Sequence, residues 1–270
     1  MDANSPITRR AVLKDMGKAG LAVMVFGTAC TAEPTSEPTG TGTSPASSTT
    51  SGSETTTTAG DTTTTPSAST AGTMWARAEM AIVSAYILYR GGEAALIDTG
   101  QSGSAPDIEA ALGGVGLGWE AVGHVILTHR HPDHVGSVDA VAELATNSVF
   151  HIGEGDAEAV GDLGSGGTQL ASDGDNIFDL RVIETSGHTV GHISVLDEAA
   201  GILVVGDAMN RMDGVLSGSN PSFTADAAAA DESVRKLAGF EFEVVLFGHS
   251  DPILSGGSAE VRDLATALGS

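Results

Sequence analysis

The sequence predicts an α+β domain in which two mixed β-sheets pack together and helices cover their outer faces. Strand-like and helix-like segments are mixed along the chain, but without the regular strand–helix–strand alternation of a doubly wound sheet. In addition, five strand-like runs lead to a histidine or an aspartate, namely Asp98, His129, His188, Asp207 and His249. Ligands so far apart in sequence can bind one site if the strand ends share one edge of a sheet sandwich.

Residues 1–29 have the pattern of an export signal. Arg9 and Arg10 lie in a stretch that resembles the twin-arginine consensus, and residues 20–29 form a short apolar run. That run is shorter than the ~20 apolar residues that a membrane-spanning helix needs. Cys30, the only cysteine, follows a G-T-A stretch that resembles a lipobox, so we expect it to be lipidated. We therefore expect twin-arginine export and a cell-surface lipoprotein or extracellular protein.

Residues 30–72 are almost entirely Thr, Ser, Pro, Gly, Ala and Glu. Such a segment buries too little apolar surface to offset the entropy of ordering, so a disordered tether is predicted. Residues 73–270 then form a single domain of ordinary size.

The chain is strongly acidic, with 12 Lys+Arg against 35 Asp+Glu and a net charge of −23. This charge disfavours nucleic acid and anionic lipid as partners, so membrane contact is expected only through a lipid on Cys30. The composition fits both an ordinary secreted protein and one adapted to high salt, and these alternatives stay open. No oligomeric state is predicted.

Apolar runs and their flanking turns predict the elements of the folded part in order. The first half is predicted to hold a hairpin of strands 80–89 and 93–98, a helix 106–112 that begins with proline, a buried strand 124–128 and an amphipathic helix 135–144. The second half is predicted to hold a strand 148–152, a helical turn 156–160, a loop 161–167, a strand 176–184, a hairpin of 193–196 and 201–205, a helix 225–238 and a strand 242–247.

The stretch 128–136, T-H-R-H-P-D-H-V-G, is rich in metal-ligand types: His129, His131, Asp133 and His134. Imidazole and carboxylate groups suit zinc or another first-row divalent ion. The stretch is expected to lie on the turn that leaves a strand and enters a helix. Side chains on such a turn can converge on a point beyond the sheet edge.

These motifs resemble those of the metallo-β-lactamase superfamily. H-x-H-x-D-H at 129–134, Gly-His at 187–188, Gly-Asp at 206–207 and Gly-His at 248–249 all follow an L-I-D-T-G strand. The resemblance extends from about residue 80 to the C-terminus and implies a four-layer αββα sandwich with two divalent metal ions, with zinc expected and iron or manganese as alternatives. It implies that one ion is held by His129, His131 and His188, the other by Asp133, His134 and His249, and that Asp207 bridges the two.

The resemblance also implies roles for neighbouring residues. Asp98 and His192 are expected to support the ligand loops from behind without binding the ions. Asp133 is expected to be a ligand that can also exchange a proton during catalysis. His124 and His151 are expected to be structural, with a position of His151 in the cleft as the alternative.

The predicted activity is hydrolysis of an ester, thioester or lactone bond in a small-molecule substrate by a metal-bridging hydroxide. The site resembles glyoxalase II-like thioesterases and lactonases, although few basic residues follow His249 as glyoxalase II would require. A mononuclear iron oxidoreductase similar to persulfide dioxygenases is the main alternative. A true β-lactamase is disfavoured by the bridging aspartate, and a non-catalytic binding lipoprotein by the complete ligand set. Loops after Tyr86, at 161–168 and at 209–223 are expected to form the pocket walls.

Overall fold

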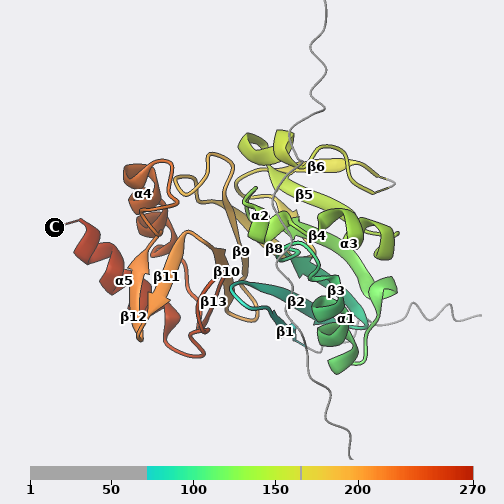
Figure 1. Cartoon of the computed structure of the whole chain (residues 1–270). Coiled ribbons are helices and arrows are strands. Elements are labelled where there is room, and N and C mark those ends of the chain that lie inside the picture. The colour runs from blue at the N-terminus through green and yellow to red at the C-terminus, as the bar shows by residue number, and fades with distance from the viewer. Residues whose placement is uncertain (1–71, 165, 270) are drawn as a thin grey trace, which may run out of the picture. The chain divides into compact units, whose positions relative to one another are not determined.

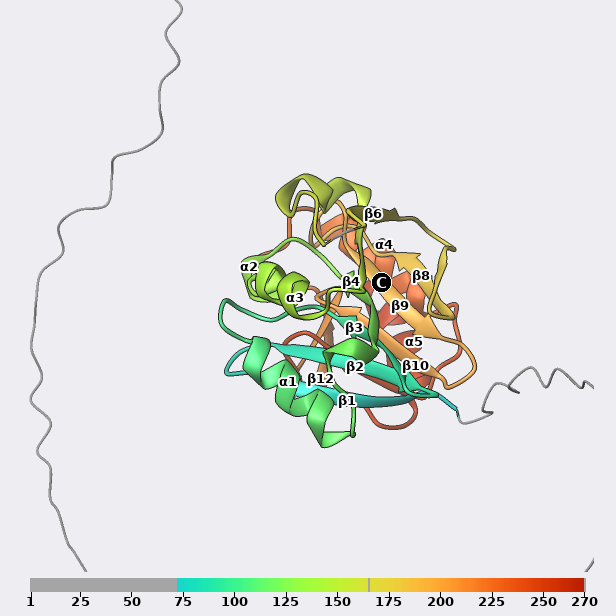
Figure 2. The same ribbon diagram turned by 90° about the vertical axis from the view of Figure 1, so that its right-hand side faces the viewer.

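Two β-sheets packed face to face occupy the middle of the folded part, and helices cover both outer faces (Figures 1 and 2). The computed structural model describes residues 72–164 and 166–269, all of which belong to one unit, Thr63–Ser270. The predicted export signal, Cys30 and the predicted tether up to residue 71 lie outside the described residues. Across the described ranges, no helix is both long enough and apolar enough to cross a membrane.

The first sheet has six strands in the order β1-β2-β3-β4-β5-β6, antiparallel from β1 to β3 and parallel from β3 to β6. These strands are β1 (Met74–Glu79), β2 (Ser84–Arg90), β3 (Glu93–Ile97), β4 (Val122–Leu127), β5 (Val149–Gly153) and β6 (Thr168–Ala171). The helical elements between them are α1 (Ala105–Gly114), η1 (Trp119–Ala121), α2 (Pro132–Val135), α3 (Val138–Leu144) and η2 (Glu154–Ala159).

The second sheet has five strands in the order β13-β10-β9-β8-β7, antiparallel except for the β10–β13 pair. These are β7 (Asn176–Ile177), β8 (Leu180–Glu184), β9 (Ile193–Asp197), β10 (Ile202–Gly206) and β13 (Val244–Phe247). A separate hairpin and two helices complete this half: β11 (Met209–Met212), β12 (Val215–Gly218), α4 (Ala227–Leu237) and α5 (Gly257–Leu268).

Three apolar clusters separate four layers. Ile108 of α1 and Val141 of α3 pack on the outer face of the first sheet. Ile126 of β4 belongs to a second cluster that fills the space between the sheets. Val234 of α4 and Val261 of α5 pack on the outer face of the second sheet. Figure 1 shows α1 and α3 on one side of the sheets and α4 and α5 on the other. This αββα sandwich confirms the predicted fold class.

Two predictions of continuous elements are wrong. The predicted helix 135–144 is interrupted, because Gly136 donates its N–H to the carbonyl of Gly100 (2.8 Å), outside the helix. The predicted strand 176–184 is also interrupted, because Phe178 and Asp179 have φ values of 54° and 52°. Two consecutive residues in the left-handed region form a tight hairpin turn, which here joins β7 to β8.

Four features have no counterpart in the prediction, namely β1, β6, the β11–β12 hairpin and α5. Strands β1 and β6 lie at opposite edges of the first sheet, and most of their residues are not fully buried. An edge strand that is only partly covered lacks the apolar run that marks a buried strand in sequence.

Candidate metal centre

The seven side chains predicted as ligands meet at one edge of the sandwich. The 129–134 stretch follows β4 of the first sheet, whereas the other three residues follow β8, β10 and β13 of the second sheet. Their ligand atoms form three overlapping groups, and within each group every ligand atom lies within 4.8 Å of the others. The groups are His129, His131 and His188; His129, His134 and Asp207; and Asp133, His134 and His249.

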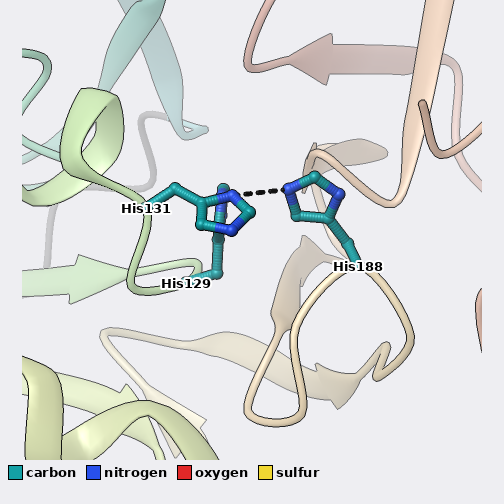
Figure 3. Close-up of side chains that lie close together, drawn as sticks. All are labelled: His129, His131 and His188. Carbon is teal, nitrogen blue, oxygen red and sulfur yellow. Dashed lines mark hydrogen bonds between the residues drawn. The ribbon is translucent and has the colours of Figure 1, made fainter. Parts of the chain in front are cut away.

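The first group consists of three imidazoles with nitrogens directed at one another. His131 Nδ1 lies 3.1 Å from His129 Nε2 and 2.9 Å from His188 Nε2 (Figure 3). Burial lowers the pKa of His129 well below its usual value and that of His188 to about 4, so both rings are neutral at neutral pH. Neutral imidazole nitrogens are the form that binds a metal ion.

The group of Asp133, His134 and His249 combines two imidazoles and a carboxylate and shares no member with the first group. His249 Nε2 lies 3.3 Å from His134 Nε2 and 3.2 Å from Asp133 Oδ2. Asp133 and His249 are partly open to solvent, whereas the His134 side chain is fully buried. This group therefore forms the accessible side of the centre.

Asp207 lies between the two groups. Its Oδ2 is 3.4 Å from His188 Nε2 and 3.3 Å from His249 Nε2, and its Oδ1 is 3.4 Å from His134 Nε2. Oδ1 is buried and has no hydrogen-bond partner among the described residues. A buried carboxylate oxygen without a partner is unfavourable, and a bound cation would remove that cost. The donor set of imidazoles and carboxylates therefore fits divalent metal ions.

The outward ring nitrogens of three histidines are held by protein groups. His134 Nδ1 donates to Asp98 Oδ2 (2.7 Å), and His249 Nδ1 donates to the carbonyl of Ile82 (2.5 Å). His188 Nδ1 lies 2.9 Å from the hydroxyl of Ser219. Such partners fix the orientation of a ligand ring, so that the other nitrogen faces the centre.

Asp98 and His192 contact ligand residues from behind. Asp98 accepts hydrogen bonds from the Thr128 N–H (2.7 Å) and hydroxyl (2.8 Å) as well as from His134, and it is nearly fully buried. His192 Nε2 accepts from the N–H of Asp207 (3.1 Å), so its proton is on Nδ1, which faces Thr185 Oγ1 at 2.8 Å. Burial lowers the pKa of His192 to about 3, so this ring is neutral.

Asp156 joins two ligand loops, a role that the sequence motifs do not indicate. Its buried carboxylate accepts from the N–H of Arg130 (3.1 Å) in one loop, and from the hydroxyl of Thr189 and the N–H of Gly191 in the other. Its partners lie 26 to 35 residues away in sequence. An acid in a short turn resembles an ordinary surface residue, so no local signal predicts this role.

A cavity of about 830 Å³ lies over the centre. His131, Asp133, Asp207 and His249 line it, together with residues of 209–223, as predicted. None of the described residues of loop 161–168 lines this cavity, contrary to the prediction. His151 lies outside this cavity, so the alternative that it faces the cleft is also wrong.

Comparison with known proteins agrees with this geometry. The family model of the metallo-beta-lactamase superfamily matches residues 80–249. The chain therefore belongs to the metallo-beta-lactamase superfamily.

Individual proteins that are similar to this chain include two hydrolases and a solved structure with the same fold. The protein named "Probable metallo-hydrolase YflN" from Bacillus subtilis is 30% identical over 54% of this chain and 71% of its own length. A hydroxyacylglutathione hydrolase from Rhodospirillum rubrum is 31% identical over 49% of this chain, and the match spans only 50% of that enzyme. The crystal structure of a metallo-beta-lactamase family protein from Thermus thermophilus shares the fold, with a TM-score of 0.55 and 21% identity over 73% of this chain and 79% of that one.

Replacing Gly248 by alanine is expected to weaken metal binding. A Cβ at this position would lie 2.3 Å from Asp207 Oδ1 and 2.7 Å from His134 Cε1, so candidate ligands must move. We expect the affinity for zinc to fall by roughly 10–100-fold, the range seen when ligand orientation is lost. Competition against a chromophoric chelator measures this change. Gly113→Ala is the matched control, because a Cβ there meets nothing within 4 Å and its affinity should stay unchanged. Equal affinities in the two variants would contradict the prediction.

Metal binding is expected to release protons and to strengthen as pH rises. Burial by itself lowers the pKa of His134, but the carboxylates of Asp98 and Asp207 outweigh it and raise that pKa to about 10. Hydrogen bonds to Asp133 and Asp207 raise the pKa of His249 to about 10. Both rings therefore hold a proton at neutral pH when no metal is bound.

Because a metal ion binds only the neutral ring, each of these protons must leave, and affinity should increase from pH 6 towards pH 10. Calorimetry in two buffers with different ionisation enthalpies measures the number of protons released, which we expect to include about two per chain from these rings, in addition to any proton lost by metal-bound water. An affinity that does not change over this range would contradict the raised pKa values.

Proposed function

We propose that this protein is a dinuclear zinc hydrolase that cleaves an ester, thioester or lactone bond. The observation that carries the proposal is the pair of adjoining ligand groups, which meet at Asp207 on the floor of the 830 Å³ cavity. The superfamily includes the hydrolase relatives described above, which supports hydrolysis as the reaction. The group of Asp133, His134 and His249, which is separate from that of His129, His131 and His188, favours two ions over the single iron of the oxidoreductase alternative.

Two divalent ions at this centre would lower the pKa of a shared water and polarise the carbonyl oxygen of the substrate. Asp133 lines the cavity beside the ligand rings, and the adjacent His249 lowers its pKa. Its carboxylate is therefore ionised at neutral pH and is placed to accept a proton from the attacking water and return it to the leaving group.

The cavity favours a neutral substrate with an apolar portion. Ile82, Met212 and Phe223 line it with exposed fractions of 61%, 71% and 67%. Large apolar side chains left open to solvent around a cavity are typical of a binding surface for an apolar group. Among the described residues, no lysine or arginine lines this cavity, and Arg211 lies outside it. Apart from the candidate metal centre itself, the charged side chains that line the cavity are therefore carboxylates, which disfavour a substrate with an anionic group away from the centre.

A hydrolysis screen of the zinc-loaded protein tests this proposal. The substrates are a neutral long-chain acyl thioester, its ester and lactone counterparts, an anionic hydroxyacylglutathione, a chromogenic β-lactam and a phosphodiester. We expect turnover of at least one neutral acyl substrate and little turnover of the last three. Turnover of the β-lactam or the phosphodiester alone would overturn the assigned bond type.

Metal content tests the reaction class separately. We expect two zinc ions per chain after purification in zinc-containing medium. One iron per chain, together with oxygen uptake in the presence of a persulfide, would establish the oxidoreductase alternative instead.

We further propose that the protein acts outside the cytoplasm, anchored through a lipid on Cys30. The twin-arginine-like stretch supports this route, which transports folded proteins, so metal would be loaded before export. Changing Arg9 and Arg10 to lysine should retain the protein in the cytoplasm, as measured by cell fractionation. Cys30→Ala is the companion variant, which should still be exported but should lose membrane association. Unchanged export of the double lysine variant would contradict the signal assignment.

A further inference from the structure

The loop of residues 219–224 contributes both to the substrate cavity and to the candidate metal centre. Four of its residues line the cavity, namely Ser219, Asn220, Pro221 and Phe223. The hydroxyl of Ser219 also lies 2.9 Å from Nδ1 of His188, a ring of the first ligand group. One loop therefore forms a wall of the cavity and holds a candidate metal ligand.

The hydroxyl of Ser219 differs from a carbonyl partner, because it can either donate or accept a hydrogen bond. His249 Nδ1 faces the carbonyl of Ile82, which can only accept, so that nitrogen must carry a proton. Ser219 leaves two possibilities for His188. If its hydroxyl donates to Nδ1, the proton of the neutral ring is on Nε2, and Nε2 then has no lone pair for a metal ion.

The hydrogen bonds of Thr224 decide between these possibilities. Thr224 Oγ1 lies 2.7 Å from the carbonyl of Asn220, so its single hydroxyl proton is used in that bond. Ser219 Oγ lies 2.7 Å from the same Oγ1 and must therefore donate to it. Only acceptor lone pairs of Ser219 are left for His188. The proton of that ring is therefore on Nδ1, and the lone pair of Nε2 faces the other ligand atoms.

The turn that supplies the carbonyl of Asn220 is itself fixed. This carbonyl also accepts from the N–H of Phe223 (3.0 Å), and the Asn220 side chain accepts from the N–H of Ser222 (3.0 Å). Pro221 restricts the backbone further, because its ring fixes φ. The last acceptor in the chain of hydrogen bonds is therefore held by its own turn and does not depend on the metal centre.

Main-chain contacts join the end of the loop to the segment that carries His188. The N–H of Ala225 donates to the carbonyl of His188 (3.1 Å), and the N–H of Asp226 donates to the carbonyl of Gly187 (2.9 Å). A Cβ on Gly187 would lie 2.2 Å from the backbone nitrogen of Ala230 in α4, so the two segments are in close contact. The His188 ring is therefore held in place relative to the loop.

A second ring of the first ligand group is held in the same manner. Thr128 Oγ1 donates to the carboxylate of Asp98 (2.8 Å), so its hydroxyl proton is also used. It can then only accept from Nδ1 of His129, which lies 3.1 Å away. Two of the three imidazoles in this group thus depend on a hydroxyl whose own proton is used in another bond.

We propose that Ser219 and Thr224 are positioning residues that keep the proton of His188 on Nδ1, so that metal binding by the first group depends on a wall of the substrate cavity. The proposal rests on the proposed metal centre, but not on the type of bond that is cleaved. Thr224 does not itself line the cavity, and its Oγ1 lies 3.5 Å from His188 Nδ1, farther than Ser219 Oγ. An effect of its hydroxyl on metal binding would therefore report on the chain of hydrogen bonds.

Thr224→Val removes this hydroxyl at nearly constant shape. Ser219 then loses its acceptor and is free to donate to His188, so we expect part of the protein to carry the ring proton on Nε2. Long-range proton–nitrogen NMR spectra of the metal-free full chain at mildly alkaline pH distinguish the two forms. The affinity for zinc, measured by competition with a chromophoric chelator, should fall by roughly 10–100-fold, as when a ligand ring loses its support.

Three further variants serve as comparisons. Thr224→Ser keeps the hydroxyl and should retain the wild-type ring proton position and zinc affinity. Ser219→Ala removes the direct partner of His188 and should lower the zinc affinity at least as much as Thr224→Val. Ser222→Ala is the matched control, because this exposed serine bonds within the loop through its main-chain N–H, and both measurements should stay unchanged.

The comparison of Thr224→Val with Thr224→Ser decides the outcome even if Ser219→Ala does not fold, which circular dichroism would show. A wild-type ring proton position and zinc affinity in Thr224→Val would overturn the proposal and leave Ser219 as a local hydrogen-bond partner. Neither measurement uses turnover. A hydrolysis screen without turnover would therefore count against the proposed function and not against this inference.

Discussion

Replacing Asp207 by alanine is expected to abolish hydrolysis while the domain still folds. Its carboxylate contacts rings of both ligand groups, through His188 on one side and through His134 and His249 on the other. Without it, the two groups share no acidic ligand, and occupancy of at least one ion should fall. We expect kcat/KM to decrease by more than the roughly 100-fold that loss of a supporting partner costs. Metal content and turnover, measured on the same preparation, test this expectation.

The matched control for this variant is Asp231→Ala. Asp231 lines the same cavity, but it does not belong to any of the ligand groups in the described chain. Removing its charge should leave metal content unchanged and alter turnover much less. Circular dichroism verifies that both variants fold. Full activity of Asp207→Ala with two bound ions would refute the bridging role of this residue.

Among the substitutions considered, replacing Asp98 by alanine is expected to lower the free energy of unfolding the most. This buried carboxylate accepts hydrogen bonds from His134 Nδ1 and from both the N–H and the hydroxyl of Thr128. Removing one partner of a buried charged pair costs ~3–5 kcal/mol, because the groups that remain are left without an acceptor. The free energy of unfolding, measured by urea denaturation without metal, tests this value independently of ligand binding.

Two control variants show which property of Asp98 matters. Asp98→Asn keeps the shape and one acceptor oxygen, so it should lose less stability than the alanine variant. Asp251→Ala removes an exposed carboxylate that pairs with Arg77 (3.0 Å) and should cost at most ~1 kcal/mol. With metal present, Asp98→Ala should also bind zinc more weakly, because the His134 ring loses its orientation. Equal unfolding free energies for the Asp98 and Asp251 variants would contradict this account.

The sequence predicts the layers of the fold well and the interruptions of its elements poorly. Strongly apolar strands such as β9 and β10 carry their own periodic signal, so their positions are confirmed. The break at Gly136 depends on a hydrogen bond to Gly100, and the turn at Phe178 and Asp179 depends on left-handed backbone within an apolar run. These events are decided by tertiary contacts, which no local pattern contains.

The candidate site shows the same division. Its seven proposed ligands lie in short motifs with recognisable spacing, so sequence alone identifies them, and the structure brings them together. Such motifs do not predict the roles of Asp156 and Ser219, because each acts through a contact to a residue at least 26 positions away in sequence. The contact between the rings of His124 and His151 also has no local sequence signal, because the two residues meet only when β4 and β5 pair.

The two sheets supply different parts of the candidate centre, and this division has a consequence for folding order. His134 and His249 lie 115 residues apart, and the chain has a single cysteine. Bound ions would therefore act as cross-links that close long loops, as disulfides do in other proteins. Closing such a loop costs conformational entropy, and this loss has already occurred once the two sheets have largely assembled. Metal uptake should follow assembly of both sheets, and a chelator should strip the metal at a rate limited by opening of the sandwich.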